Sequence, residues 1–498
     1  MSPRDDNGYD YDFAVIGGGP AGMAAAATAA GHGLATVLID EQPAPGGQIY
    51  RNIETVTAER PKVAGMLGAD YAHGRGLAEA FRASGADYLP EASVWELSDE
   101  GGIGLLDSSG ARMLRARRVL IAIGAMERPA PRPGWTLPGV MTLGACQTLM
   151  KNAGQVPDVP CVIVGSGPLV WLVAKQLVAA GAPPAAVLDT TAGGNLWPAL
   201  GVFAGALGSL ADIRKGLKWI GEIKRAGVKI EKGVSDVRFS GEGALRRIDY
   251  QAGGAARSRD VSLALVHEGV VPNYQLAEAA GCDIVWDETQ VGWRTRADGW
   301  GATSCEAIAV AGDCVGIGGA IAAEAEGRLV AHDTACRLGK IDTARRDTLA
   351  ADDRRALTRL AGLRRFLDLY YRPAPEVLCP PDDATMICRC EEISAGDMRK
   401  VAARGCPGPN QAKAFTRAGM GPCQGRMCGL AVSAVLAEAR GVSMAEVGHY
   451  RVRPPLKPIT VDQLAAMAGL DTGVAALSGL PTGAERLDEA EAEVEAGA

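Results

Sequence analysis

The chain has 498 residues, of which 47% are hydrophobic and 22% are charged, and its formal net charge is −7. This length indicates about three domains, and the composition is that of a folded globular protein. The negative charge argues against binding of nucleic acid, which requires a basic face.

The terminal segments do not resemble targeting signals. Residues Met1–Asp6 are polar and acidic, unlike a secretory signal peptide. The most apolar stretch, Met23–Ala30, is too short to span a bilayer. We therefore expect a cytoplasmic protein with no transmembrane segment, held at a membrane only through a partner or an electron acceptor. The tail Glu485–Glu495 alternates Ala with acidic residues, which predicts a frayed helix or disorder.

A βαβ unit opens the chain. A buried strand at Asp12–Ile16 leads into a G-x-G-x-x-G loop, an Ala-rich helix to about Ala30, and a second strand at Thr36–Ile39. Such a loop lets a pyrophosphate approach the positive helix N-terminus, although a glycine-rich packing turn is the alternative. Asp40 follows Gly22 by 18 residues and fits a ribose-binding acid better than its neighbour does. The predicted dinucleotide-binding residues are Gly17, Gly19, Pro20, Ala21, Gly22 and Asp40, with Glu41 as the fallback.

Three further glycine segments are expected at the same cofactor. The loop Gly46-Gly47-Gln48 can bring backbone close to phosphates or to the isoalloxazine ring, and Gly124 ends a strand at Ile121–Gly124. Gly312-Asp313 ends another strand ahead of a helix, where the acid can bind ribityl hydroxyls. The alternative role for Asp313 is that of a turn or helix-capping residue.

A second βαβ unit begins at Cys161–Val164. Its loop has Gly165 and Gly167, but Val170 replaces the third glycine, which would push the helix away from the strand. Asp189 stands where a ribose-binding acid belongs. Two such units predict an α/β fold with two dinucleotide-binding domains. We expect that the second unit still binds a nucleotide or is vestigial, and that it does not use NAD(P)H.

Four cysteines near the C-terminus form a C-x-C pair and a C-x₄-C pair. They are Cys388, Cys390, Cys423 and Cys428. Four thiolates are the ligand set of a [2Fe–2S] cluster. Structural zinc is the alternative, but its cysteine pairs are usually spaced C-x₂₋₄-C, and C-x-C is tight for that geometry.

No catalytic residue is predicted. The flavin region contains no C-x-x-C pair, which excludes disulfide-reductase chemistry there. The five histidines stand at no motif spacing, and His267 is the only one that merits a test.

The expected domain boundaries follow from these motifs and from the Pro-rich segment Pro373–Pro381. They are a FAD-binding domain at 10–150 and 261–337, an inserted NAD(P)-like domain at 151–260, a helical and Pro-rich linker at 338–384, a [2Fe–2S] module at 385–455, and a C-terminal segment at 456–498.

These motifs, with the runs Asp40–Arg51 and Glu127–Val140 and the segment Ala311–Asp313, resemble one family. It is the FAD- and [2Fe–2S]-containing α subunit of heteromeric opine and amino-acid dehydrogenases. The family includes the corresponding subunits of octopine and nopaline oxidases, of D-hydroxyproline dehydrogenases and of hydrogen cyanide synthase. The C-terminal module resembles bacterioferritin-associated ferredoxin.

The resemblance implies a role in electron transfer. A partner β subunit of the glycine/D-amino-acid oxidase type, with its own flavin, would oxidise a secondary amine or amino acid to an imine. Electrons would then pass through FAD and the [2Fe–2S] cluster to a quinone or dye. The resemblance also implies a further FMN at a subunit junction, a further small subunit, and an adenine nucleotide in the middle domain. The alternatives are a stand-alone NAD(P)H-dependent reductase, a hydrogen cyanide synthase subunit and a structural scaffold.

Overall fold

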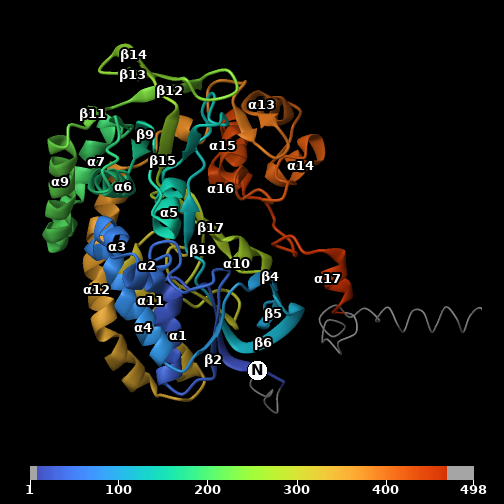
Figure 1. Cartoon of the computed structure of the whole chain (residues 1–498). Coiled ribbons are helices and arrows are strands. Elements are labelled where there is room, and N and C mark those ends of the chain that lie inside the picture. Colours follow the sequence, from blue (N-terminus) through green and yellow to red (C-terminus); the bar gives the residue numbers. More distant parts are fainter. Residues whose placement is uncertain (1–7, 468–498) are drawn as a thin grey trace, which may run out of the picture.

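The computed structural model describes residues 8–467, so the predicted acidic tail lies outside the described residues (Figure 1). The first sheet has the order β3-β2-β1-β6-β5-β4, and β19 also pairs with β6. Its strands are β1 (Tyr11–Ile16), β2 (Thr36–Ile39), β3 (Asp87–Leu89), β4 (Ser93–Leu97), β5 (Gly102–Asp107), β6 (Gly110–Ile121) and β19 (Ile308–Val310). The parallel pairs of β1 with β2 and β6 bring strands from distant parts of the chain to one edge, as a dinucleotide-binding domain requires.

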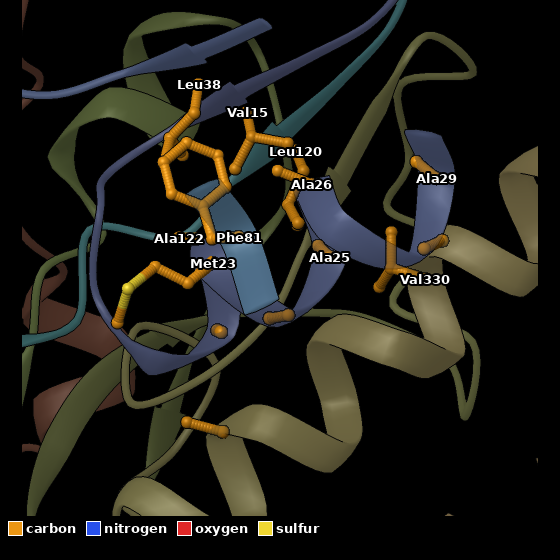
Figure 2. Close-up of a cluster of buried hydrophobic side chains, with 14 of the residues drawn as sticks. Val15, Met23, Ala25, Ala26, Ala29, Leu38, Phe81, Leu120, Ala122 and Val330 are labelled. Atoms are coloured by element: carbon orange, nitrogen blue, oxygen red, sulfur yellow. The ribbon is translucent and has the colours of Figure 1, made fainter. Parts of the chain in front are cut away.

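Two helices pack closely on this sheet. They are α1 (Pro20–Gly31) and α11 (Ala320–Arg337). Figure 2 shows Ala25, Ala26 and Ala29 of α1 turned toward the core, with Val330 of α11 beside them. A Cβ on Gly327 would lie 2.1 Å from the carbonyl oxygen of Ala21, so the small side chains allow the close approach of the two helices. The same layer includes α2 (Ile53–Glu59), α3 (Pro61–Leu67) and α4 (Ala69–Ala83).

The second sheet has the order β11-β10-β9-β15-β8. Its members are β8 (Val140–Thr142), β9 (Cys161–Ser166), β10 (Ala186–Asp189), β11 (Lys229–Lys232) and β15 (Leu263–Glu268). We expected the strand near Val261–Val266 to return to the first domain, but β15 pairs with β9 and β8 in the second. The expected boundaries at 150 and 260 are therefore wrong by one strand each, because a buried apolar strand does not reveal its partner sheet from sequence.

Helices and small sheets complete the second domain and its junction with the first. They are β7 (Ala125–Glu127), α5 (Leu143–Ala153), α6 (Pro168–Ala179), η1 (Gly193–Asn195), α7 (Leu196–Gly201), α8 (Phe203–Ala206), η2 (Leu207–Ser209), α9 (Leu210–Arg225), β12 (Ser235–Ser240), β13 (Arg247–Ala252), β14 (Ala255–Asp260), β16 (Val270–Pro272), α10 (Gln275–Ala279), β17 (Ile284–Asp287) and β18 (Gly292–Thr295).

Within the described chain, no single helix is long and apolar enough to cross a bilayer. One bent pair of helices, Gly193–Gly201 and Phe203–Arg225, with 76° between its halves, has the length and composition of a broken span.

The long helix α12 (Thr343–Tyr370) connects the dinucleotide domains to the cysteine module, which lies on the opposite side of the molecule from α9 (Figure 1). The module and its flanks contain η3 (Pro375–Val377), β20 (Met386–Cys388), β21 (Ile393–Ser394), α13 (Ala395–Ala403), α14 (Pro409–Thr416), α15 (Gly429–Arg440), α16 (Met444–Val447) and α17 (Val461–Ala465). It has its own apolar core, built around Met398, Val432 and Leu436.

Candidate functional site

A cavity of about 780 Å³ is lined by both glycine loops and by Arg426 of the cysteine module. Its volume is within the range of cofactor pockets. Among the predicted residues it brings together are Gly17, Gly19, Pro20, Ala21, Asp40, Glu41, Gly47, Gln48, Gly124, Gly167, Gly312 and Asp313. Sequence-distant segments thus meet at one site.

The first glycine loop leaves no room for larger residues. Gly17 has φ of 109°, and a Cβ there would lie 2.5 Å from the carbonyl oxygen of Ala122. A Cβ on Gly22 would lie 1.9 Å from the Gly17 carbonyl oxygen. Gly47, also at positive φ, would place a Cβ 2.7 Å from the Cα of Gly19. These close backbone approaches require glycine, and the two loops lie against each other on the cavity wall, where their backbone can bind a pyrophosphate.

Asp40 is the better ribose-binding candidate of the two acids. Its Oδ1 accepts a hydrogen bond from the backbone N–H of Gln42 at 3.0 Å, while its buried Oδ2 lies beside the Gly18 backbone and makes no hydrogen bond of regular geometry with the described residues. Burial raises the pKa of Asp40 to about 6. Glu41, in contrast, is exposed at the cavity rim, where it pairs with Lys457 at 2.9 Å and accepts from the Ser93 hydroxyl at 3.1 Å. A buried, unpartnered carboxylate oxygen fits the hydroxyls of a ribose, so the residues present fit the adenosine half of FAD.

Asp313 has the role of a turn residue as well as a place on the cavity wall. Its Oδ1 accepts from the backbone N–H groups of Gly318 and Gly319, both at 2.9 Å, just before α11 begins. Glu326 accepts from the Gly312 N–H at 2.7 Å, and burial raises the pKa of Glu326 to about 7. This turn holds the cavity wall beside the first glycine loop.

Lys151 is a cavity residue that sequence reasoning missed. Its ammonium donates to the Gln48 carbonyl oxygen at 2.8 Å and to Oε1 of Gln147 at 3.0 Å. Burial, and then the nearby Arg51 guanidinium, lower the pKa of Lys151 to about 7. No motif marks a single lysine on a helix, so only its contact with the Gln48 loop identifies it.

The second glycine loop has a buried acid at its mouth. Glu268, at the end of β15, accepts from the Ser166 hydroxyl at 3.3 Å and from the Thr190 hydroxyl at 2.9 Å, and it pairs with Arg132. A pyrophosphate at this loop would meet that carboxylate at close range, and the repulsion between like charges costs free energy, although the ion pair with Arg132 weakens it. The sequence did not single out Glu268.

The other features of the second unit are packed within the protein. Gly165 has φ of 146°, and a Cβ there would lie 1.7 Å from the His267 carbonyl oxygen. Val170 is fully buried in the core between α6 and the sheet. Asp189 is buried and accepts from the backbone N–H and hydroxyl of Thr191 at 3.0 and 2.6 Å. A separate pocket of about 160 Å³ follows Asp189 and includes Thr190 and Arg132.

The four predicted cluster ligands come together in two pairs. Hydrogen bonding from Cys428, and then from the backbone N–H groups of Gly419, Glu391 and Cys390, lowers the pKa of Cys388 to about 5, and the pKa of Cys428 is raised by the same bond. Burial, and then the neighbouring Cys423 thiol, raise the pKa of Cys390. In residues 8–467, no group of three or more His, Cys, Asp or Glu side chains has an arrangement that could hold a single metal ion.

Glycines make space around these thiols. A Cβ on Gly421 would lie 2.9 Å from the Cys390 sulfur, and a Cβ on Gly425 would lie 2.5 Å from the ring of Tyr450. Backbone N–H groups directed at a thiolate, beside a loop with glycines at positions 419, 421 and 425, are typical of a cluster-binding site. The donor set therefore fits [2Fe–2S].

Arg426 connects this loop to the cavity. It donates to the Cys423 carbonyl oxygen at 3.3 Å and to the Leu456 carbonyl oxygen at 2.6 Å, and its guanidinium lines the cavity together with Glu41. Tyr274 lies in the chain between the cavity residues Asn273 and Gln275; burial and then Glu278 raise the pKa of its phenol, with a smaller contribution from the Cys428 thiol. The flavin-type loop and the cysteine loop thus flank one cavity.

Comparison with known proteins agrees with this architecture. The family model for pyridine nucleotide-disulphide oxidoreductases matches residues 11–327, and that for the sarcosine oxidase A3 domain matches residues 383–468. The opine oxidase A subunit of Rhizobium meliloti (strain 1021) is 40% identical over 91% of this chain and 98% of that protein. The chain belongs to the opine oxidase A subunit family. As a member of the pyridine nucleotide-disulphide oxidoreductase family it is an oxidoreductase, as predicted.

Other relatives place the opine oxidase A subunit family in a wider group. Hydrogen cyanide synthase subunit HcnB of Pseudomonas aeruginosa is 34% identical over 89% of this chain and 96% of that protein. The crystal structure of L-proline dehydrogenase from P. horikoshii superposes with a TM-score of 0.66 at 19% identity, over 91% of this chain and 79% of that one. The predicted fold class, a two-dinucleotide-domain α/β flavoprotein, is confirmed by this likeness and by the family model.

Proposed function

We propose that this chain is the FAD- and [2Fe–2S]-containing electron-transfer subunit of a heteromeric dehydrogenase. Its partner flavoprotein subunit, of the glycine/D-amino-acid oxidase type, would oxidise a secondary amine or amino acid of the opine, D-hydroxyproline or proline class. The observation that carries the proposal is the single cavity that is lined by Asp40 and the first glycine loop and, through Arg426, borders the cysteine loop.

The chain's own residues bind and tune its cofactors. Bound FAD and a [2Fe–2S] cluster supply the exchange between two-electron and one-electron carriers. Asp40 would bind the ribose of FAD, and backbone N–H groups of the first glycine loop and the Gln48 loop would donate to its phosphates. The thiols Cys388, Cys390, Cys423 and Cys428 would hold the cluster. No proton transfer to or from an amine is assigned to this chain.

The second glycine loop favours a subunit that receives electrons from a partner over a stand-alone NAD(P)H-dependent reductase. Glu268 lies at the mouth of the second glycine loop, hydrogen-bonded to Ser166 and Thr190, and this arrangement disfavours the pyrophosphate of NAD(P)H. The electrons would then enter from the partner subunit and leave to a quinone or dye. An adenine nucleotide in the second domain, a further FMN and a further small subunit remain expectations from the resemblance.

The identities favour an opine-type substrate over glycine. The opine oxidase A subunit of Agrobacterium tumefaciens (strain Ach5) is 40% identical to this chain, compared with 34% for the hydrogen cyanide synthase subunit. A scaffold without redox function would have no reason to hold an unpartnered buried carboxylate at a glycine loop.

The test is co-purification with the partner subunit, followed by cofactor analysis and a substrate panel. We expect flavin, iron and sulfide in the tagged chain, and dye reduction by the complex with octopine, nopaline, proline or D-hydroxyproline. Dye reduction with glycine and cyanide release would instead assign the hydrogen cyanide synthase function. A chain that lacks flavin and iron even in the complex would contradict the proposal.

A further inference from the structure

One surface segment is unusually apolar for its exposure. Of the 14 large apolar side chains that are exposed in the described chain, six lie between residues 196 and 217. Trp197 is 76% exposed and Leu217 is 64% exposed; the others are Leu196, Leu200, Leu207 and Leu210. Exposed apolar side chains on a soluble protein are normally scattered singly over its surface. A cluster of them in one segment therefore marks an interaction surface.

The segment is seated firmly on the protein, so its exposed face is not an unpacked core. Phe203 of α8 contacts Phe366 of α12, with ring centroids 5.5 Å apart. Gly205 and Gly362 let the same two helices meet closely, since a Cβ on Gly362 would lie 2.0 Å from the Gly205 carbonyl oxygen. Ile223 of α9 is buried against the second domain. The inner side is thus fixed and the outer side is apolar.

Basic residues follow the exposed apolar residues along the sequence. The chain has no charged residue from Thr190 to Ala211, and α9 then brings Arg214, Lys215, Lys218, Lys224 and Arg225 against two acids, Asp212 and Glu222. Lys215 pairs with Asp70, and Lys218 lies 4.0 Å from Glu222. Within residues 8–467, Arg214, Lys224 and Arg225 form no side-chain ion pair, and all three are exposed. The segment is therefore basic in a chain of net charge −7.

We propose that the surface of α7 to α9 is a docking face for an anionic membrane, with Trp197 and the exposed leucines entering the lipid interface and the unpaired basic residues meeting the headgroups. Helices that lie in the plane of a membrane combine Leu and Trp with Lys and Arg in this way. Aromatic side chains such as Trp prefer the interface region, and each basic residue is attracted by an anionic leaflet.

A protein partner fits these observations less well. The centre of a protein–protein interface is depleted in lysine, while this surface has Lys218 directly after Leu217 and Lys224 about two helical turns further along α9. The cysteine module lies on the other side of the molecule, so its surface stays free when α9 meets a membrane (Figure 1). Trp219 of α9 lines the cavity, and docking would therefore bring one cavity wall near the lipid. The inference does not depend on the proposed redox function.

The experiment is flotation of the purified full-length chain with vesicles, using equal parts of phosphatidylglycerol and phosphatidylcholine or phosphatidylcholine alone. We expect binding to the anionic vesicles that weakens with added salt. The double variant Trp197→Ser/Leu217→Gln should bind at least about tenfold more weakly, because the removed side chains no longer bury apolar area. Lys224→Gln should weaken binding roughly fivefold.

Matched controls come from the same chain. Val461→Ser removes a side chain that is 79% exposed outside the segment, and Lys62→Gln removes an exposed lysine that forms no ion pair with any described residue; neither should change binding. Quenching of tryptophan fluorescence by brominated lipid should be stronger in the wild type than in Trp197→Phe. Absence of binding to anionic vesicles, or equal binding by the double variant, would overturn the proposal. Unchanged vesicle binding with loss of the partner subunit in the double variant would overturn it as well and assign the face to that partner.

Discussion

A Cβ atom on Gly18 would lie 2.0 Å from Oδ2 of Asp40, so no side chain fits between these two residues. Gly18 is the middle residue of the loop and is not a position of the G-x-G-x-x-G pattern. Its hydrogen-sized side chain leaves the Asp40 carboxylate beside the loop on which a pyrophosphate would bind.

Gly18→Ala should therefore abolish retention of FAD. The added methyl group displaces either the loop or Asp40, and both belong to the cofactor cradle. The flavin content of the purified chain, from its absorbance after denaturation, measures the effect. Gly76→Ala is the control, since a Cβ there meets nothing within 4 Å and alanine stabilises a helix relative to glycine. Equal flavin content in Gly18→Ala and the control would refute this assignment.

The two adjacent acids should differ in their effect on flavin binding. Asp40→Ala removes a buried, unpartnered carboxylate, and should weaken FAD binding about 10- to 100-fold, as for hydrogen bonds to a charged group. Glu41→Ala removes an exposed ion pair with Lys457 and a hydrogen bond from the Ser93 hydroxyl, and should change affinity less than about fivefold. Titration of the apo-chain with FAD, followed by fluorescence, compares the two. A larger loss of FAD affinity in Glu41→Ala than in Asp40→Ala would assign ribose binding to Glu41 instead.

Cys428→Ser should remove iron and acid-labile sulfide from the chain, because Cys428 is one of four thiols that interact in pairs. Cys336→Ser is the control, because this thiol lies at the end of α11, far along the chain from the others. Metal analysis reads out both variants. If the wild-type chain contains zinc in place of iron, the four cysteines form the alternative structural zinc site. If Cys428→Ser retains its iron, Cys428 is not a ligand.

Lys151 should make stability depend on pH. Its pKa is lowered from 10.5 to about 7 in the folded chain, so between these values the unfolded chain binds more protons. The free energy of unfolding contributed by this residue should then rise with pH across that window, by up to about 5 kcal/mol, and be constant below pH 7. Lys151→Met should remove the rise, whereas Lys62→Met, at an exposed position, should keep it. Urea unfolding at a series of pH values tests this, and an identical pH slope in Lys151→Met would show that Lys151 stays charged.

The local patterns in the sequence predicted the glycine loops and the strand ends because each is a short segment with its own backbone requirement. They did not predict that β15 joins the second sheet, since its pairing with β9 depends on packing between distant segments. For the same reason they missed Gly18, Lys151 and Glu268. Each of these acts through a neighbour far along the chain or outside the motif, and no spacing marks such a contact.

The measurement that tests the central claim most directly is an anaerobic visible spectrum of the purified chain, before and after addition of NADH and then after addition of the partner subunit with an amine substrate. We expect that the flavin and cluster bands stay oxidised with NADH, because Glu268 lies at the second glycine loop, and bleach when partner and amine are present. Rapid bleaching by NADH alone would contradict the proposed function and assign a stand-alone reductase.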